Sequence, residues 1–302
     1  MTPPTGQHGF LAELRAQLHH YGRLMRVDRP IGIWLLLWPT LWALWLSADG
    51  TPDPWIFTVF VLGALVMRSA GCVINDLADR NLDGRVARTR DRPLVTGDVA
   101  PAEALALFVA LSMIAIGLVL TLDRLTQMLA VGAAALTVLY PFCKRFLAAP
   151  QLVLGIAFAW AVPMAFAAHT GYIPRLAWLL ALAVVVWAIA YDTMYAMADR
   201  QDDLKAGIRS TAILFGQADV FVIAVLQLVF LFALLLVGEV ARLGMWYRLS
   251  LLISALFMLY QFTLIRTRKP DACFRAFRNN RHIGATVFAG IILSYTFDPL
   301  SA

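Results

Sequence analysis

The sequence predicts an all-α integral membrane protein with about nine transmembrane helices, in a single domain that covers residues 1–302. Two properties of the composition support this prediction: 61% of the residues are hydrophobic, and only 15% are charged. Soluble proteins carry about 25% charged residues, so this composition indicates a protein that is surrounded mainly by lipid rather than water. Backbone groups in lipid need internal hydrogen-bond partners, and the alternating pattern of barrel strands is missing, so we expect the spans to be helices.

The nine candidate spans are apolar runs close to the ~20 residues that a helix needs to cross a bilayer. Six are uncharged: residues 30–48, 104–122, 125–143, 146–174, 220–238 and 249–265. Three are shorter or contain a charge: residues 55–75 with Arg68, residues 176–191 just before Asp192, and residues 283–297. Prolines at 39, 141 and 163 are expected to kink their helices. Residues 1–29 are expected to form a cytoplasmic tail and an amphipathic segment at the membrane surface.

The basic residues indicate which side of the membrane each loop faces. Of the 25 Lys and Arg residues, twenty lie in the N-terminal segment and in the loops after even-numbered spans, and only four lie in the other loops. Cytoplasmic loops are enriched in Lys and Arg, so we expect the N-terminus in the cytoplasm and, with nine spans, the C-terminus outside. A short N-terminus without a presequence is typical of a protein of the bacterial inner membrane.

Acidic residues gather at the cytoplasmic end of the second span. Asn75, Asp79 and Asp83 are spaced by four, which places them on one face of a helix, and Asp76 adds a further carboxylate. Carboxylates this close repel one another, and the repulsion costs more near lipid. A divalent cation would offset the repulsion. Mg²⁺ in proteins commonly takes one or two carboxylates together with substrate phosphates, so the pattern predicts a Mg²⁺ site.

The sixth span ends in a second cluster of the same kind. Asp192, Tyr195, Asp199 and Asp203 share one helix face. The string Ala-Asp-Arg-x-x-Asp at 78–83 occurs again at 198–203, which suggests two pseudo-repeated four-helix halves whose acidic ends face each other. Solvated helix ends are the alternative interpretation, but two matched clusters on one side of the membrane argue against it.

Basic residues surround both clusters. Arg88 follows the first cluster, Tyr140 and Lys144 are four residues apart at the end of the fourth span, and Arg68 lies about two turns inside the second span. Acids that hold Mg²⁺ beside bases that hold phosphate oxygens predict a site for a diphosphate. An intramembrane Arg is a functional candidate, although snorkelling or pairing with a nearby carboxylate would also explain Arg68.

Three motifs together carry a family resemblance: Asn75-Asp76-x-x-Asp79-x-x-x-Asp83, Tyr140-x-x-x-Lys144 and Asp199-x-x-x-Asp203. In these residues the chain resembles the UbiA-type intramembrane prenyltransferases, over nearly its whole length. Flanking strings such as Arg90-Asp-Arg-Pro-Leu and Tyr140-Pro-Phe-Cys-Lys-Arg are similar to the branch of that family that acts on 4-hydroxybenzoate.

The resemblance implies nine helices around a central cavity, with cytoplasmic caps over the acids. It implies Mg²⁺ as cofactor, and transfer of a polyprenyl group from polyprenyl diphosphate to the ring of 4-hydroxybenzoate, ortho to the hydroxyl, in ubiquinone biosynthesis. The implied metal ligands are Asn75, Asp79, Asp83, Asp199 and Asp203. The implied diphosphate contacts are Arg68, Arg88, Tyr140 and Lys144, and the implied catalytic residues are Asp192, Tyr195 and Lys144. Neither a nucleic acid nor an obligate protein partner is expected.

Two alternatives stay open at the level of the sequence. One is a prenyltransferase of the same family with another aromatic acceptor. The other is an ion-coupled membrane transporter, because intramembrane acids and internal repeats also occur in that class. Transporter sites usually lie near the middle of the bilayer, whereas these acids lie at one surface, which favours the enzyme.

Overall fold

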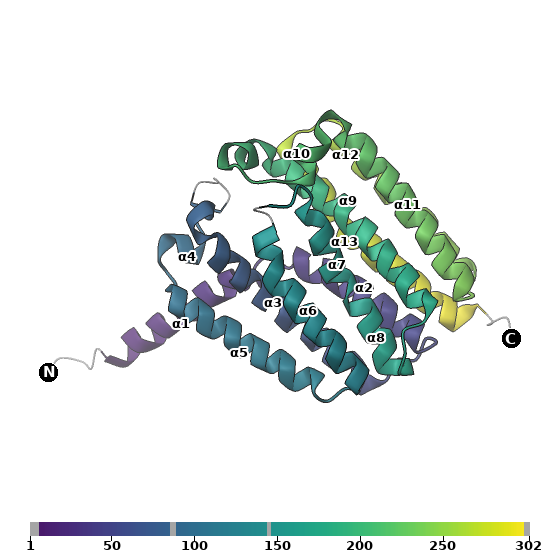
Figure 1. Ribbon diagram of the computed structural model, residues 1–302, viewed down its shortest axis with the longest axis horizontal. Coiled ribbons are helices and arrows are strands. Elements are labelled where there is room, and N and C mark those ends of the chain that lie inside the picture. The colour runs from purple at the N-terminus through teal and green to yellow at the C-terminus, as the bar shows by residue number, and fades with distance from the viewer. Residues whose placement is uncertain (1–5, 85–88, 144–145, 299–302) are drawn as a thin grey trace.

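The computed structural model describes residues 6–84, 89–143 and 146–298, without the side chains of residues 6–11, 82 and 83, and all of its regular elements are helices (Figure 1). In chain order the α-helices are α1 (Gly6–Leu24), α2 (Ile31–Ser47), α3 (Pro54–Asp83), α4 (Pro93–Thr96), α5 (Pro101–Val119), α6 (Arg124–Cys143), α7 (Pro150–Ala159), α8 (Ala161–Thr170), α9 (Arg175–Ala206), α10 (Thr211–Phe215), α11 (Asp219–Val240), α12 (Met245–Ile265) and α13 (Pro270–Phe297). A short 3-10 helix, η1 (Gly216–Ala218), precedes α11. The predicted all-α class is confirmed.

Seven stretches of the described residues are long and apolar enough to cross a membrane. They lie in α3, α5, α6, α7 with α8, α9, α10 with α11, and α12. The helix α2 is a shorter apolar helix of 17 residues, and α13 has 28 residues of which the second half is apolar. The protein is therefore a multi-pass membrane protein. Each predicted span overlaps one of these helices, and the total of nine crossings stays a prediction.

The apolar run at 146–174 forms two helices instead of one. Helix α7 ends at Ala159 and α8 begins at Ala161, with Trp160 between them. Pro163 explains this break, because proline has no N–H to donate to the carbonyl of Ala159 four residues earlier. Pro39 and Pro141, in contrast, lie inside α2 and α6, which continue through them.

Buried aromatic side chains fix α9 against α2, α11 and α13. The Trp187 ring stacks on Trp42 and on Phe230, with centroid distances of 5.3 Å and 5.5 Å. Trp42 Nε1 donates to the carbonyl of Gly284 at 3.1 Å, and Trp187 Nε1 donates to Asn280 Oδ1 at 2.9 Å. Hydrogen bonds between helices in apolar surroundings hold the helices in one register. This packing therefore sets the position of the acidic end of α9.

Helices α5 and α6 lie at one flank of the bundle and α11 lies at the other (Figure 1). Only 6% of the apolar window of α5 and 11% of that of α6 is buried. Large apolar side chains on α5, such as Val109, Met113 and Ile114, are exposed. Apolar surface of this extent is expected to face another apolar phase. The flank formed by α5 and α6 is therefore a lipid-facing wall.

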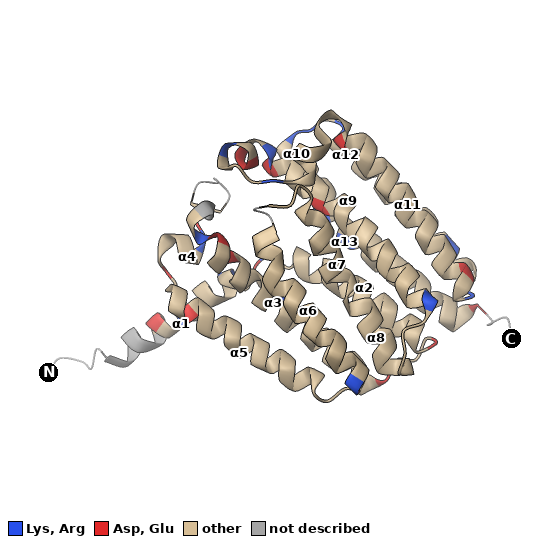
Figure 2. Cartoon of the chain, in the orientation of Figure 1, with Lys and Arg blue, Asp and Glu red and all other residues tan. Residues whose placement is uncertain are grey.

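The charged residues gather at the ends of the long helices (Figure 2). The short helices α4 and α10 pack beside α3 and α9, which are the two helices that end in the acidic motifs. The fold therefore surrounds the acidic helix ends with loop segments that are rich in arginine. The cytoplasmic caps that the family resemblance implied over the acids stay a prediction.

Candidate active site

A cavity of about 880 Å³ lies among α2, α3, α5, α6 and α9. One end is lined by charged side chains from the loops that precede α2 and α4, including Arg26 and Arg92. Along α5 the lining is mostly apolar, with Phe108, Ile116 and Val119 on one helix face. The cavity therefore combines a polar end with an apolar channel beside the lipid-facing wall.

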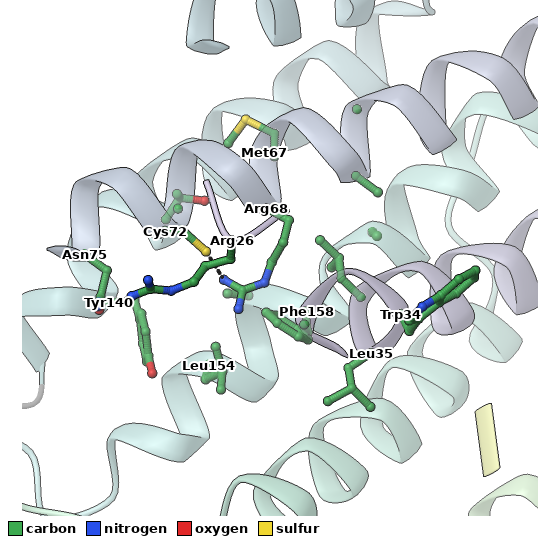
Figure 3. Close-up of a pocket in the computed structure, with 18 of the residues that line it drawn as sticks. Arg26, Trp34, Leu35, Met67, Arg68, Cys72, Asn75, Tyr140, Leu154 and Phe158 are labelled. Atoms are coloured by element: carbon green, nitrogen blue, oxygen red, sulfur yellow. Dashed lines mark hydrogen bonds between the residues drawn. The ribbon is translucent and has the colours of Figure 1, made fainter. Parts of the chain in front are cut away.

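Helix α3 presents a polar stripe to this cavity. Arg68, Cys72 and Asn75 are spaced by four and three residues, so they share one helix face, and all three line the cavity. Arg68 Nη1 donates to the sulfur of Cys72 at 3.0 Å (Figure 3). In the same view Arg26 points toward Asn75 and Tyr140, and Tyr140 comes from α6. Three separate segments thus supply polar groups to one space.

Helix α9 lines the same cavity with Asp192 and Tyr195. The Tyr195 ring packs against two rings of α13, edge-on to Phe277 at 4.9 Å and tilted to Phe274 at 6.0 Å. Both phenylalanines also line the cavity, so α9 and α13 together form an aromatic wall next to a carboxylate. Helices α3 and α9 therefore line the same cavity, and the meeting of their acidic ends stays a prediction.

The remaining predicted ligands lie further along the two helices. Asp79 is one turn beyond Asn75 and is buried, while Asp199 and Asp203 are one and two turns beyond Tyr195 and are half-buried. Within the described parts of the chain, no three His, Cys, Asp or Glu side chains are close enough together to hold one metal ion. Arg88 and Lys144 lie outside the described residues, as does the side chain of Asp83.

The available donors nevertheless suit Mg²⁺. Asn75 offers an amide oxygen, and Asp79, Asp199 and Asp203 offer carboxylate oxygens, which are the hard ligands that Mg²⁺ prefers. Protein sites usually give Mg²⁺ only one or two carboxylates and leave the other positions to water and substrate phosphates. The oxygen donors are divided between the ends of α3 and α9. This arrangement suits Mg²⁺ ions that take some of their ligands from the protein and the others from the diphosphate of the substrate.

Asp76, the residue after Asn75, pairs with two arginines. Its side chain is 2% exposed, and its oxygens accept from Arg92 Nη1 at 2.8 Å and from Arg26 Nη2 at 2.9 Å. Arg26 belongs to the turn between α1 and α2 and has a φ of +60°, and Arg92 directly precedes α4. A buried carboxylate is tolerated when it is paired in this way. Asp76 therefore attaches two loops to α3 at the polar end of the cavity.

A second buried carboxylate has the same role beside α9. Asp219 is fully buried and pairs with Arg200, the residue after Asp199, and with Arg268 Nη2 at 2.8 Å. The hydrogen bond to Asp219 raises the pKa of Arg268 above its ordinary value, so this guanidinium stays charged. Sequence reasoning missed both clusters, because each carboxylate takes its arginines from separate segments and no local spacing reveals the pairs.

A family model and curated relatives match the chain. The model of the UbiA prenyltransferase family matches residues 36–297. The 4-hydroxybenzoate octaprenyltransferase of Aeromonas hydrophila subsp. hydrophila is 56% identical over 275 residues, which cover 91% of this chain and 96% of that protein. The protein of the same name from Coxiella burnetii (strain CbuK_Q154) is 54% identical over 285 residues, which cover 94% and 99% of the two chains.

Solved structures show the same arrangement of helices. A UbiA homolog from Aeropyrum pernix K1 superposes with a TM-score of 0.77 at 25% identity, covering 87% of this chain and 97% of that one. A UbiA homolog from Archaeoglobus fulgidus, bound to GPP and Mg²⁺, superposes with a TM-score of 0.74 at 18% identity, covering 92% and 99%. From its sequence, its fold and its cavity, this chain belongs to the UbiA prenyltransferase family.

Proposed function

We propose that the protein transfers a polyprenyl group from a polyprenyl diphosphate to 4-hydroxybenzoate, at the ring carbon ortho to the hydroxyl, and releases diphosphate, as a step of ubiquinone biosynthesis. The cavity carries the proposal, because α3 and α9 bring polar groups to one end and an apolar channel continues along α5. A diphosphate suits the polar end, and an isoprenoid chain suits the channel. The names of relatives that are 54–56% identical supply the acceptor.

We assign Mg²⁺ to the acidic ends of α3 and α9. Asn75, Asp79 and Asp83 would hold it from one helix, and Asp199 and Asp203 would hold it from the other. When bound there, Mg²⁺ supplies positive charge that stabilises the leaving diphosphate.

We assign the contacts to the diphosphate to basic and hydroxyl groups around the polar end of the cavity. Tyr140 lines the cavity on the same side as Asn75 (Figure 3). Lys144 follows one turn later in the sequence, and Arg88 follows the acidic end of α3. Cationic donors aimed at the leaving oxygens lower the barrier to breaking the C–O bond. Lys144 is assigned to catalysis for this reason.

The reacting carbons then meet the aromatic wall. When the allylic C–O bond breaks, its electron pair leaves with the diphosphate, and the prenyl group becomes a delocalised cation. The ring faces of Tyr195, Phe274 and Phe277 stabilise a nearby cation, and the apolar lining excludes water that would capture it. The ortho carbon of the acceptor forms the new C–C bond. Asp192 is our candidate for the base that removes the ring proton and restores aromaticity.

We place the N-terminus and the polar end of the cavity on the cytoplasmic side of a bacterial inner membrane, and the C-terminus outside. The arginine-rich loops that line this end support the placement, because positive loops stay in the cytoplasm. A water-soluble acceptor would then enter from the cytoplasm, while the prenyl donor and the product stay in the bilayer.

The decisive assay uses detergent-purified protein, 4-hydroxybenzoate and a polyprenyl diphosphate, with Mg²⁺ or with EDTA. We expect prenylated 4-hydroxybenzoate only in the presence of Mg²⁺, and full recovery when Mg²⁺ is restored. Product from a different aromatic acceptor alone would show that the acceptor is wrong. If no acceptor gave a prenylated product, and the protein drove ion-coupled uptake of a solute into sealed vesicles, a transporter would be favoured.

A further inference from the structure

A row of arginines runs along one face of α13. Arg275, Arg278 and Arg281 follow one another at intervals of three residues and form the α13 stripe. His282 lies next to them, and all four residues fall within about 120° of one another around the helix. All four are exposed. The stripe therefore presents three positive charges on the surface of a helix whose second half is apolar.

Other arginines of the protein are neutralised by buried carboxylates, whereas those of the α13 stripe are not. Asp76 and Asp219 each pair with two arginines from separate segments. Within the described part of the chain, no carboxylate forms an ion pair with the stripe, and Arg281 Nε donates to the neighbouring His282 Nε2 at 3.2 Å. Cations in or near a membrane that have no internal counter-charge are candidates for binding an anion.

Contacts between α2 and α13 fix the position of the stripe along the bundle. Trp42 Nε1 donates to the carbonyl of Gly284 at 3.1 Å, and a Cβ at Gly284 would overlap with the side chain of Trp38. Just beyond the end of α2, a Cβ at Gly50 would overlap with the side chain of Tyr295, which is close to the end of α13. The two helices therefore run parallel, with Gly284 beside the middle of α2.

This register places the stripe at the edge of the apolar layer. Arg275 is level with the first turn of α2, where the uncharged run at 30–48 begins, and Arg281 lies about 9 Å further along the helix axis. Arginine side chains at such a depth keep their stems in apolar surroundings and extend their charged ends to the headgroups. Guanidinium groups from successive turns therefore reach the same layer of lipid phosphates.

Aromatic side chains on both sides of the stripe lie at the same level. On α2, Trp34 is exposed and stacks on Trp38 with a centroid distance of 5.2 Å. On α12, Phe257 stacks on His282 at 5.7 Å, and Tyr260 is exposed. Exposed Trp and Tyr side chains are enriched where the headgroups meet the apolar layer. The stripe therefore lies between two aromatic edges at the level of the headgroups.

We propose that the α13 stripe binds the phosphate headgroup of an anionic phospholipid in the leaflet on the cytoplasmic side. Guanidinium groups form charge-assisted hydrogen bonds with phosphate oxygens, and basic sites on membrane helices on this side bind anionic headgroups. The acyl chains lie along α12, where Leu256 and Leu252 are exposed one and two turns beyond Tyr260. This binding site is independent of the proposed prenyl transfer.

The surroundings of the stripe favour a phospholipid over the diphosphate of the donor. The diphosphate needs Mg²⁺, and the acids proposed to hold Mg²⁺ are on α3 and α9 rather than on α13. In Figure 3 Trp34, which lies on α2 beside the stripe, is at the opposite side of the view from Asn75 and Tyr140. A phospholipid phosphate carries a single negative charge and needs only cationic donors. The choline of a zwitterionic lipid adds a positive charge that the stripe repels.

Thermal unfolding in detergent tests the site without any substrate. The purified protein is titrated with phosphatidylglycerol or with phosphatidylcholine of the same acyl chains. We expect phosphatidylglycerol to raise the unfolding temperature and phosphatidylcholine to leave it nearly unchanged, because a ligand that binds only the folded state stabilises that state. Equal shifts with the two lipids would overturn the proposal.

The charge of the stripe is removed by the combined substitution Arg275→Gln, Arg278→Gln and Arg281→Gln. A basic residue near an anionic lipid contributes about fivefold in affinity, so this variant should bind phosphatidylglycerol about 100-fold more weakly. Lysine at the same three positions should keep most of the affinity. Unfolding with phosphatidylcholine alone reports whether each variant folds. Unchanged stabilisation of the glutamine variant by phosphatidylglycerol would contradict the site.

The matched control is the combined substitution Arg15→Gln, Arg266→Gln and Lys269→Gln. These three basic residues are also exposed, and they lie on the side assigned to the cytoplasm but outside the stripe. Their loss removes the same charge from the same side, so we expect phosphatidylglycerol to bind nearly as tightly as to the wild-type protein. An equal loss of affinity in the two variants would mean that the lipid responds to overall charge, which contradicts a specific site.

Photocrosslinking locates the lipid on the unmodified protein. The probe is a phosphatidylglycerol with a photoactivatable group in one acyl chain, and mass spectrometry of peptides maps the products. We expect cross-links to concentrate on α12 and to be suppressed by excess phosphatidylglycerol but not by phosphatidylcholine. Cross-links spread evenly over α5 and α6 would overturn the site. Suppression by a polyprenyl diphosphate without Mg²⁺, but not by phosphatidylglycerol, would assign the stripe to the donor instead.

Discussion

At the scale of single residues, Asp76 and Asp219 each neutralise one of two paired arginines. One member of each cluster adjoins a predicted metal ligand in the chain: Asp76 follows Asn75, and Arg200 follows Asp199. Guanidinium groups beside the ends of α3 and α9 offset part of the repulsion among the acids there. They also attract anionic substrates to the polar end of the cavity.

The acids at the helix ends are expected to be essential for turnover but not for folding. Asp79→Ala or Asp199→Ala should reduce kcat below detection, because each removes an oxygen donor for the proposed Mg²⁺. We expect both variants still to insert into the membrane and to fold. Wild-type rates in both variants would show that the site has been wrongly assigned.

The control for these variants is Asp271→Ala. Asp271 is an exposed carboxylate in the first turn of α13. Its loss should leave turnover near the wild-type value, because only a weak interaction with the helix terminus is removed. A similar loss of turnover in this variant would mean that the assay reports general damage rather than ligand loss.

The spacing of residues predicts part of the candidate site. Asn75, Asp192 and Tyr195 face the cavity as expected, because helical periodicity determines which residues share a face. The sequence did not reveal that Asp76 pairs with Arg26 and Arg92, since those contacts depend on how loops pack in three dimensions. Local spacing predicts the face of a helix, and tertiary packing decides what lies opposite that face.

At the scale of elements, long apolar runs predict helices well and short loop helices poorly. The runs at 125–143 and 249–265 correspond to α6 and α12 within a few residues. The helices α4 and α10 have only four and five residues, so no hydrophobic period identifies them. The two-helix form of the 146–174 run follows from one missing hydrogen-bond donor at Pro163.

The end of α9 is expected to depend on Asp219. Asp219→Asn removes the negative charge between the half-buried Arg200 and the exposed Arg268. A buried pair that loses one partner costs about 3–5 kcal/mol when the other charge stays buried. Both guanidinium groups here reach solvent, so we expect a smaller loss of thermal stability than that, together with weaker activation by Mg²⁺. Unfolding curves and Mg²⁺ titrations of turnover would measure the two effects.

A matched control is Glu239→Gln at the opposite end of α11. Glu239 pairs with Arg248 at 2.9 Å, but both side chains are more than 60% exposed. Exposed pairs contribute about 0–1 kcal/mol, so stability and Mg²⁺ dependence should barely change. If the two variants were equally destabilised, burial of Asp219 would not explain its effect.

At the scale of the whole molecule, the sequence predicts the fold because lipid leaves the chain few choices. Apolar runs in a bilayer have to be helical, and the arginine content of the loops alternates from one side to the other. The arrangement of the helices around a cavity was only implied by resemblance, since it depends on contacts such as those of Trp187 with Trp42 and Phe230.

The orientation in the membrane has a direct test with single introduced cysteines. The natural residues Cys72, Cys143 and Cys273 are buried, so they should give little background. In intact spheroplasts, Arg248→Cys should react with a membrane-impermeant maleimide, and Lys269→Cys should react only after lysis. The reverse labelling would place the polar end of the cavity outside the cell.

The lipid-facing wall of α5 and α6 determines which measure of donor concentration controls the rate. The channel beside α5 is suited to a donor that arrives within the bilayer, so the enzyme responds to the mole fraction of donor among lipids rather than to its molarity in water. Adding empty detergent micelles or lipid lowers the mole fraction of the donor among lipids, although its molarity in the whole solution is unchanged. Dilution of the donor by other lipids would therefore raise the apparent KM for the donor, as a competitive inhibitor does.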